Sequence, residues 1–379
     1  MTLDARALLM AVRAEALSAS HPRARVQASL LGMTPPDRPI RAIALGKAAS
    51  AMLEGARDAW NIAEDDARVF AGAHPVPDHT SIDAADSAIT FARDGGDALR
   101  LFLVSGGASS MLCAPHEDGS LELKQRVTAV LLGAGLDVAS MNVVRAHLSR
   151  IKGGGLARAA GNAPRITVVV SDVLLGDASA VGSGPTLPDL TTGDDARRIA
   201  DSVGLTNLPF HETPKNLGPA PCIVAASPQV LAEETARALE ARGIRARILA
   251  PSVVAPEELF RDYVHLASTL QVGHAIVRVA EPTMLVHAAA GTRGGRCTHL
   301  AAMMAGNLPP GVHFLAAASD GIDGGSGTAG AIVSREIDGA ADAIARFDTG
   351  PFHCRAGTAI AEGATGNNLA DLHVLVRLT

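Results

Sequence analysis

Short, almost wholly apolar segments recur along this chain, and several of them run directly into turns rich in Gly, Ser and Asp. Stretches rich in Ala and Leu with helical spacing lie between them, such as residues 48–60 and 228–242. Strands that are apolar on both faces and connected by helices are typical of parallel sheets, so the sequence predicts an α/β fold. The expected strands are residues 41–45, 99–104, 166–170, 222–225, 245–249, 284–287 and 312–317.

The length of 379 residues suggests about two domains. Hydrophobic residues make up 47% of the chain and the net charge is −6, with no basic block. This composition excludes disorder and argues against a nucleic-acid partner. No apolar run reaches the ~18 residues of a membrane span. Charged side chains interrupt the N-terminal segment, so we expect a cytoplasmic protein without a membrane partner.

The four cysteines are scattered and show no C-x-x-C spacing. They are Cys113, Cys222, Cys297 and Cys354. This pattern argues against a disulfide framework or a zinc knuckle. We expect buried structural thiols, because free cysteine is among the most buried residue types.

Ligands of open α/β sheets bind beyond the carboxyl ends of the strands. Lys47 follows the first expected strand, and it either holds an anion or lies on the surface as most lysines do. The next strand is followed by a loop of small residues that includes Ser105, Gly106, Gly107 and Ser109. Its N–H groups and hydroxyls suit a phosphate or carboxylate, although a plain tight turn has the same composition.

Acidic residues follow two other strands. Asp172 and Asp177 come after the strand at 166–170, where they either meet a ligand or cap the next helix. Asp320 and Asp323 lie in the motif D-G-x-D-G. Two carboxylates at this spacing can share Mg²⁺, or one can accept a proton from a substrate hydroxyl. A glycine turn capped by its own Asp side chains is the alternative.

Residues 140–152 have helical periodicity and run into three consecutive glycines. Arg145, Ser149 and Lys152 form a polar stripe on the expected helix. Such a stripe is most often a solvated face, and the functional alternative is an anion site at a domain cleft.

Taken in order, the motifs of this chain resemble those of one family across nearly the whole sequence. This family is the class II glycerate kinases, whose C-terminal part is the MOFRL domain and whose members are often labelled hydroxypyruvate reductase. The matching segments are ALGKAASAM, AHPVPDHTS, LVSGGASSML, MNVVRAHLSRIKGGGLA, VVSDV, GSGPTLPD, RGGR, SDGIDG, TAGAIV and ATGNNLADL.

The resemblance implies phosphorylation of D-glycerate to 2-phosphoglycerate with ATP and Mg²⁺. It also implies two α/β domains with mainly parallel sheets, one of them Rossmann-like, and an active site in the cleft between them. The expected domains are residues 40–215 and residues 1–39 with 216–379, the second including the MOFRL region at about 280–375. The expected partners are the small hydroxy acid and the nucleotide, and a homodimer is left open.

The same resemblance implies roles for individual residues. The catalytic lysine of the family falls on Lys47 and its arginine on Arg296, where both would neutralise charge on the transferred phosphoryl group. Its aspartate is either Asp320 or Asp323, and both are candidate Mg²⁺ ligands. The residues expected to bind substrate or phosphate are Ser105, Gly106, Gly107, Ser109, Arg145, Lys152 and Asp172.

The chain departs from the family pattern after Arg296, where Cys297-Thr298-His299 replaces the usual Asn-Gln-Glu. Such departures leave two alternatives, a diverged hydroxy-acid kinase and a weakly active or non-catalytic ligand-binding protein. An NAD(P)H-dependent hydroxypyruvate reductase is a third. It would need a dinucleotide turn, and the G-x-G-x-x-G match at 325–330 lies too far beyond its strand.

Overall fold

The structure, a computed structural model, describes residues 4–284 and 292–379. The chain folds into two compact units, Pro22–Ala225 and Met1–His21 with Ala226–Thr379. The expected domain boundaries were residues 40 and 215, whereas the compact unit runs from Pro22 to Ala225. Of the expected strand at 284–287, residues 285–287 lie outside the described part of the chain.

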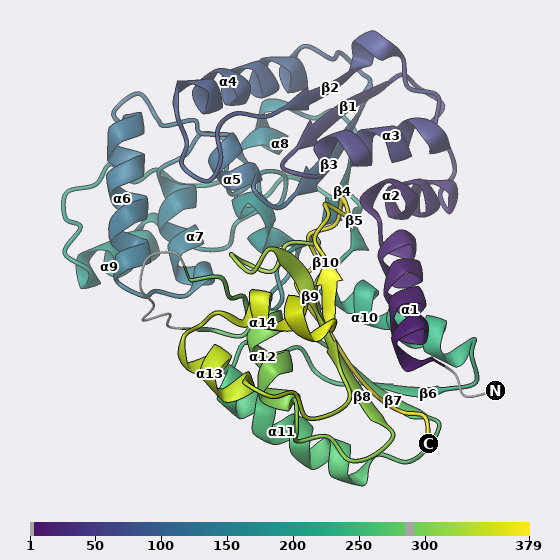
Figure 1. Ribbon diagram of the computed structural model, residues 1–379. Helices are drawn as coiled ribbons and strands as arrows, with labels where there is room; N and C mark the ends of the chain where they lie inside the picture. The colour runs from purple at the N-terminus through teal and green to yellow at the C-terminus, as the bar shows by residue number, and fades with distance from the viewer. Residues whose placement is uncertain (1–3, 285–291) are drawn as a thin grey trace. The chain divides into compact units, whose positions relative to one another are not determined.

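The Pro22–Ala225 unit contains a five-stranded sheet in the order β2-β1-β3-β4-β5 (Figure 1). Strand β1 pairs in parallel with β2 and β3, and β3 pairs in parallel with β4. This doubly wound order reverses direction between β1 and β3, so a crevice is expected there at the carboxyl ends of the strands. The strands are β1 (Ile40–Leu45), β2 (Ala67–Phe70), β3 (Leu99–Ser105), β4 (Arg165–Val170) and β5 (Cys222–Ala226).

Helices cover both faces of this sheet (Figure 1). The right-handed crossovers β1–α3–β2 and β2–α4–β3 run in opposite directions, so α3 (Ala49–Ala59) and α4 (His79–Arg93) lie on opposite faces. Helix α4 buries its alanines against a core that contains Ile43 and Phe102. The other helices are α2 (Pro22–Leu31), η1 (Glu64–Asp66), α5 (Ala108–Met111), α6 (Leu121–Gly133), α7 (Val138–His147), α8 (Gly155–Ala159), η2 (Ala178–Ser183) and α9 (Gly193–Ser202).

The second unit contains a six-stranded sheet in the order β10-β9-β8-β11-β7-β6. Only β6 and β7 pair in parallel, and the other neighbours are antiparallel. The α/β class is therefore confirmed, but this sheet is mixed rather than mainly parallel. The last strand, β11, inserts antiparallel between β7 and β8, and β9 and β10 continue the antiparallel pairing beyond β8. The strands are β6 (Arg245–Ile248), β7 (His274–Ala280), β8 (Val312–Ala318), β9 (Thr328–Val333), β10 (Ala359–Ala361) and β11 (Asp371–Arg377).

Helices α1 (Ala5–Ala19) and α10 (Pro228–Glu240) pack together, and α10 lies against β6 and β7. Helices α11 (Pro256–Thr269) and α12 (Arg296–Met304) share a core with Phe314 and Leu375. Helices α13 (Ala340–Ala345) and α14 (Thr349–Ala356) pack against α12. Within the described ranges, no helix has both the length and the apolar character that a membrane crossing requires.

The expected helix at 140–152 is shorter than predicted. Helix α7 ends at His147 with Leu148 as its C-cap. Leu148 packs with α6 and α9, whereas Ile151 belongs to the core beneath the parallel sheet. The helical spacing of these two apolar residues is therefore coincidental, and Ser149 and Lys152 do not continue a stripe from Arg145.

Candidate functional site

Two loops meet where the parallel sheet reverses direction. Gly46 follows β1 with φ +98°, and a Cβ atom on it would lie 2.4 Å from the carbonyl oxygen of Ser105 after β3. The Lys47 N–H donates to the carbonyl of Gly106 (2.9 Å), and the Ala48 N–H donates to Ser105 Oγ (3.0 Å). Only glycine permits this approach, so Gly46 and the buried Ser105 hydroxyl hold the two loops together.

Gly106 and Gly107 make room for three titratable side chains. A Cβ atom on Gly106 would lie 1.9 Å from Asp172 Oδ2. A Cβ atom on Gly107 would lie 2.9 Å from Lys47 Cγ and 3.3 Å from His74 Cδ2. The glycines therefore allow Lys47, His74 and Asp172 to lie against one loop. The sequence-predicted residues Lys47, Gly106, Gly107 and Asp172 come together here.

The charges of these three side chains interact. Burial raises the pKa of Asp172, although Lys47 and His74 oppose the shift. Burial and the charge of Lys47 lower the pKa of His74, and Asp172 opposes that shift. His74 was missed in the sequence as an individual candidate, although it lies within the AHPVPDHTS segment.

Ser109 is fixed from two sides. Its Oγ lies 2.9 Å from Ser183 Oγ, and Ser183 donates to Asn142 Oδ1 (2.8 Å). Lys152 Nζ donates to the Ser109 carbonyl (2.6 Å), and the lysine is only 2% exposed. Lys152 therefore positions the loop through its backbone.

Three cations are gathered near this loop. Burial and the charges of Arg145 and Lys124 lower the pKa of Lys152 well below its usual range. Burial likewise lowers the pKa of Lys124 to about 8 and that of Arg145. In the described part of the chain, no carboxylate pairs with the Arg145 guanidinium. An anionic ligand near Arg145 would be favoured, because it would offset this excess of positive charge.

In the second unit, Arg296 begins α12 and pairs with Asp371 of β11. Arg296 Nε lies 2.9 Å from Asp371 Oδ2, and Nη2 donates to Oδ1 (3.3 Å). The arginine side chain is 41% exposed, while Asp371 is 2% exposed. Burial raises the pKa of Asp371 to about 7, although Arg296 opposes the shift. The buried carboxylate orients an arginine whose outer part remains accessible.

Asp320 and Asp323 occupy different environments. Asp323 caps α12, because its Oδ1 accepts from the Cys297 N–H (3.0 Å) and its Oδ2 from the Thr298 N–H and Oγ1 (both 2.8 Å). Asp320 is half-buried, and its Oδ1 accepts from the Ile322 N–H (2.9 Å). No described residue donates a hydrogen bond to Asp320 Oδ2. Asp320 is therefore the carboxylate with a free oxygen.

Arg13 is a further residue that was not singled out in the sequence. It lies on α1 and donates to the Ala318 carbonyl (3.3 Å). Burial lowers the pKa of Arg13, and the charge of Asp320 opposes this shift. Nothing in the local sequence pattern of an amphipathic helix distinguishes this arginine from a surface residue.

Several alternatives from the sequence are resolved by geometry. Asp177 caps η2 by accepting from the Ser179 N–H (2.8 Å), as the capping interpretation expected. The G-x-G-x-x-G segment at 325–330 runs into strand β9 and opens no helix, so it is no dinucleotide turn. Cys113 and Cys297 are buried as expected, but Cys222 and Cys354 are exposed, because β5 and α14 turn these positions outward.

Comparison with known proteins adds to this geometry. Residues 8–213 match the family described as a domain of unknown function, DUF4147, and residues 274–371 match the MOFRL family. A protein of Agrobacterium vitis, provisionally named a hydroxypyruvate reductase, is 30% identical over 99% of this chain and 95% of its own length. The D-glycerate 2-kinase of Thermotoga maritima is 29% identical over 81% of this chain and 79% of its own. A crystal structure of glycerate kinase from Thermotoga maritima superposes with a TM-score of 0.87, at 25% identity, covering 98% of this chain and 99% of that one.

Proposed function

The chain belongs to the family of proteins that combine a DUF4147 domain with a MOFRL domain, and from this premise we propose that it phosphorylates D-glycerate. The phosphoryl donor is ATP and the product is 2-phosphoglycerate. One structural observation supports this proposal most directly. The exposed Lys47 lies over a glycine loop at the switch point of a doubly wound sheet, and the same unit holds Arg145, whose guanidinium pairs with no carboxylate of the described residues.

Phosphoryl transfer depends on positioning and on neutralising charge more than on covalent chemistry. Lys47 supplies a positive charge whose location is fixed by Gly107 and by the Gly46 turn. Arg296 supplies a planar donor that the buried Asp371 orients. We assign to each of these cations, within its own unit, the neutralisation of charge on phosphoryl oxygens.

The small-residue loop and Arg145 are suited to the anionic end of a ligand. Ser109 keeps a fixed hydroxyl, and Lys152 holds its carbonyl so that the loop cannot collapse. Arg145 is a guanidinium, which binds a carboxylate or phosphate through two parallel hydrogen bonds. We assign to this loop the binding of a carboxylate or phosphate group.

Mg²⁺ prefers oxygen ligands and is usually bound with ATP through one or two carboxylates. Asp320 fits this requirement, because one of its oxygens is free and the side chain is half-buried. Asp323 does not fit it, since both of its oxygens already accept hydrogen bonds at the start of α12. Bound Mg²⁺ would neutralise charge on the phosphates, and Asp320 would hold it or accept the hydroxyl proton of glycerate.

The reductase name of one relative does not carry over on structural grounds. A hydride transfer from NAD(P)H needs a turn that binds the pyrophosphate, and the segment at 325–330 leads into a strand. The loops after β1 and β3 lack the spacing of such a fingerprint.

The direct test is ADP release by the purified protein with Mg-ATP and D-glycerate, with the product identified by phosphorus NMR. Oxidation of NADH by hydroxypyruvate in the same preparation is the control. Glycerate-dependent ADP with 2-phosphoglycerate is the expected result. NADH consumption without ADP release would overturn the proposal in favour of the reductase.

Two matched pairs of variants connect the activity to the site. Lys47→Met and Arg296→Lys should each lower kcat by ~100-fold or more, the effect of removing one oriented charge from a phosphoryl or oxyanion site. Lys215→Met and Arg346→Lys make the same substitutions at exposed positions that pair with Glu212 and Asp342. These two controls should retain the parent kcat. Equal rates in all four variants would rule out the assigned roles.

A further inference from the structure

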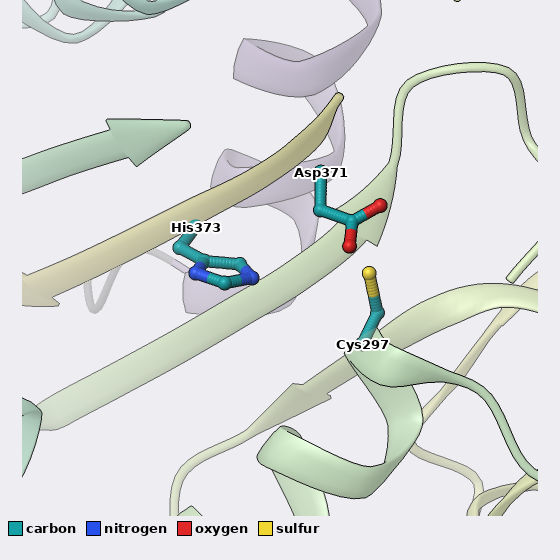
Figure 2. Close-up of side chains that lie close together, drawn as sticks. All are labelled: Cys297, Asp371 and His373. Carbon is teal, nitrogen blue, oxygen red and sulfur yellow. The ribbon is translucent and has the colours of Figure 1, made fainter. Parts of the chain in front are cut away.

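A cysteine, a carboxylate and a histidine converge inside the second unit. One ligand atom each from Cys297, Asp371 and His373 lies within 4.8 Å of the others, and all three residues are buried. Figure 2 shows the Cys297 thiol, the Asp371 carboxylate and the edge of the His373 ring directed toward a common region. Zinc bonds of about 2.0–2.3 Å at tetrahedral angles place ligand atoms ~3.3–3.8 Å apart, so small side-chain rotations suffice to close the site.

The fold positions these ligands on two rigid elements. Asp371 and His373 are two residues apart on β11, so their side chains lie on the same face of the sheet. Cys297 is the second residue of α12, and its N–H is fixed by Asp323.

Two buried polar atoms in this cluster lack a hydrogen-bond partner within the described residues. They are His373 Nε2 and Asp371 Oδ2, although Oδ2 lies in the ion pair with Arg296. The other ring nitrogen, Nδ1, lies 2.9 Å from the Tyr263 hydroxyl. A histidine that ligates a metal usually uses its second nitrogen in such a contact, which fixes the ring and its tautomer.

Charged groups of both signs surround the cluster. Arg296 acts on Cys297, Asp371 and His373, Arg13 interacts with Cys297, and Arg278 acts on His373. The carboxylates of Asp371 and Asp323 act on Cys297. Burial and these carboxylates raise the pKa of the Cys297 thiol and keep it protonated. On binding to the sulfur, a divalent cation would replace the thiol proton.

We propose that Cys297, Asp371 and His373 form a binding site for a thiophilic divalent cation of the Zn²⁺ class. Sulfur, imidazole and carboxylate together select such a metal over Mg²⁺, which prefers oxygen alone. Three protein ligands leave the fourth tetrahedral position open. Binding releases the Cys297 thiol proton to solvent, while the neutral His373 ring binds through Nε2. This site differs from the Mg²⁺ position proposed at Asp320 and does not depend on the kinase assignment.

Co²⁺ is the probe, because a cobalt–thiolate bond gives a near-ultraviolet charge-transfer band and tetrahedral Co²⁺ absorbs strongly in visible light. The parent protein is the full chain with Cys222→Ser and Cys354→Ser, which removes both exposed thiols. We expect one Co²⁺ per chain with both spectral features, displaced by one equivalent of Zn²⁺. An indicator assay at neutral pH should record release of the thiol proton.

Three variants test the ligand set. Cys297→Ser should abolish the charge-transfer band and weaken binding by ~100-fold or more. His373→Gln should weaken binding comparably, and Tyr263→Phe by ~10–100-fold, the usual effect of removing a group that orients a metal-binding histidine. Cys113→Ser, a second buried thiol, is the matched control and should leave the spectrum unchanged.

The proposal is overturned if the parent protein shows no charge-transfer band with Co²⁺, or if the band survives Cys297→Ser. If Cys297→Ser does not fold, the spectra of His373→Gln and Tyr263→Phe decide. Unchanged cobalt affinity in both would refute the site.

Discussion

Replacing Gly106 by alanine tests whether the position of Asp172 matters to the first unit. The new Cβ atom would lie 1.9 Å from Asp172 Oδ2 and 2.2 Å from Cγ. The backbone of Gly106 is not in the left-handed region, so alanine itself is tolerated there. The cost of the substitution therefore comes from the contact with Asp172.

The size of the effect follows from these distances. Ordinary van der Waals contact begins at 3.4 Å, so the carboxylate must move by about 1.5 Å. Overpacking of this kind typically costs ~1–3 kcal/mol of stability. A displacement of ~1 Å in a catalytic group can lower kcat by ~100-fold. Asp172 acts electrostatically on Lys47 and His74, so we expect kcat to fall by about that factor.

A double-mutant cycle isolates the contact. Asp172→Ala removes the atoms that the new methyl group would meet, so Gly106→Ala should cost little stability in that background. Gly133→Ala is the matched control, because nothing lies within 4 Å of its Cβ position. Urea denaturation gives the stabilities and glycerate-dependent ADP release gives kcat. Additive losses across the cycle, or a parent kcat in Gly106→Ala, would refute the reasoning.

Two further predictions concern the same unit. Gly107→Ala and Gly204→Ala should each lower the free energy of unfolding by ~1–2 kcal/mol, because both glycines have positive φ (+82° and +77°). Only Gly107→Ala, whose Cβ meets Lys47, should lower kcat. Equal kcat values in the two variants would show that the position of Lys47 is unimportant. Burial lowers the pKa of Lys124 to about 8, so with rising pH the folded state loses this proton before the unfolded state, whose lysine titrates near ~10.4. The contribution of this lysine to stability should therefore rise between pH 8 and about 10.4 and be constant below pH 8. Lys124→Met should reduce that rise by at most ~3 kcal/mol, measured by urea denaturation at several pH values, and an unchanged slope would contradict the assignment.

The strand-end loops were predictable because the parallel strands are buried almost throughout and mostly apolar. Strands β1, β3 and β4 are buried along their whole length apart from one half-buried position in β1, so their ends are visible in the sequence. Strand β11 was not predicted, because Asp371 and His373 interrupt its apolar pattern. Both residues are buried, Asp371 beside Arg296 of α12 and His373 against Tyr263 of α11, so their polar groups face the side-chain cluster rather than solvent. Local periodicity cannot distinguish a polar residue that is buried in a side-chain cluster from one that faces solvent.

The choice between Asp320 and Asp323 could not be made from the sequence for a related reason. Both occur in one glycine-rich loop with equivalent local spacing. Asp323 becomes a cap only because α12, which begins 27 residues earlier, brings the Cys297 and Thr298 N–H groups to its carboxylate. The distinction arises from tertiary structure, which separates a structural carboxylate from one with a free oxygen.

The residues that depart from the family pattern after Arg296 are directed inward. Cys297, Thr298 and His299 are all buried, and Thr298 is bonded to Asp323 and to the hydroxyl of Thr349. Arg296, immediately before them, keeps its outer part exposed and its ion pair with Asp371. A change of side chains on the buried side of α12 therefore leaves the oriented arginine in place, which favours retained phosphoryl transfer over a non-catalytic ligand-binding protein. Among the three departures, Cys297 adds a new chemical group beside Asp371. A metal bound there would compete with Arg296 for the Asp371 carboxylate. Cys297 would therefore influence the orientation of Arg296 through Asp371, while the arginine itself stays in place.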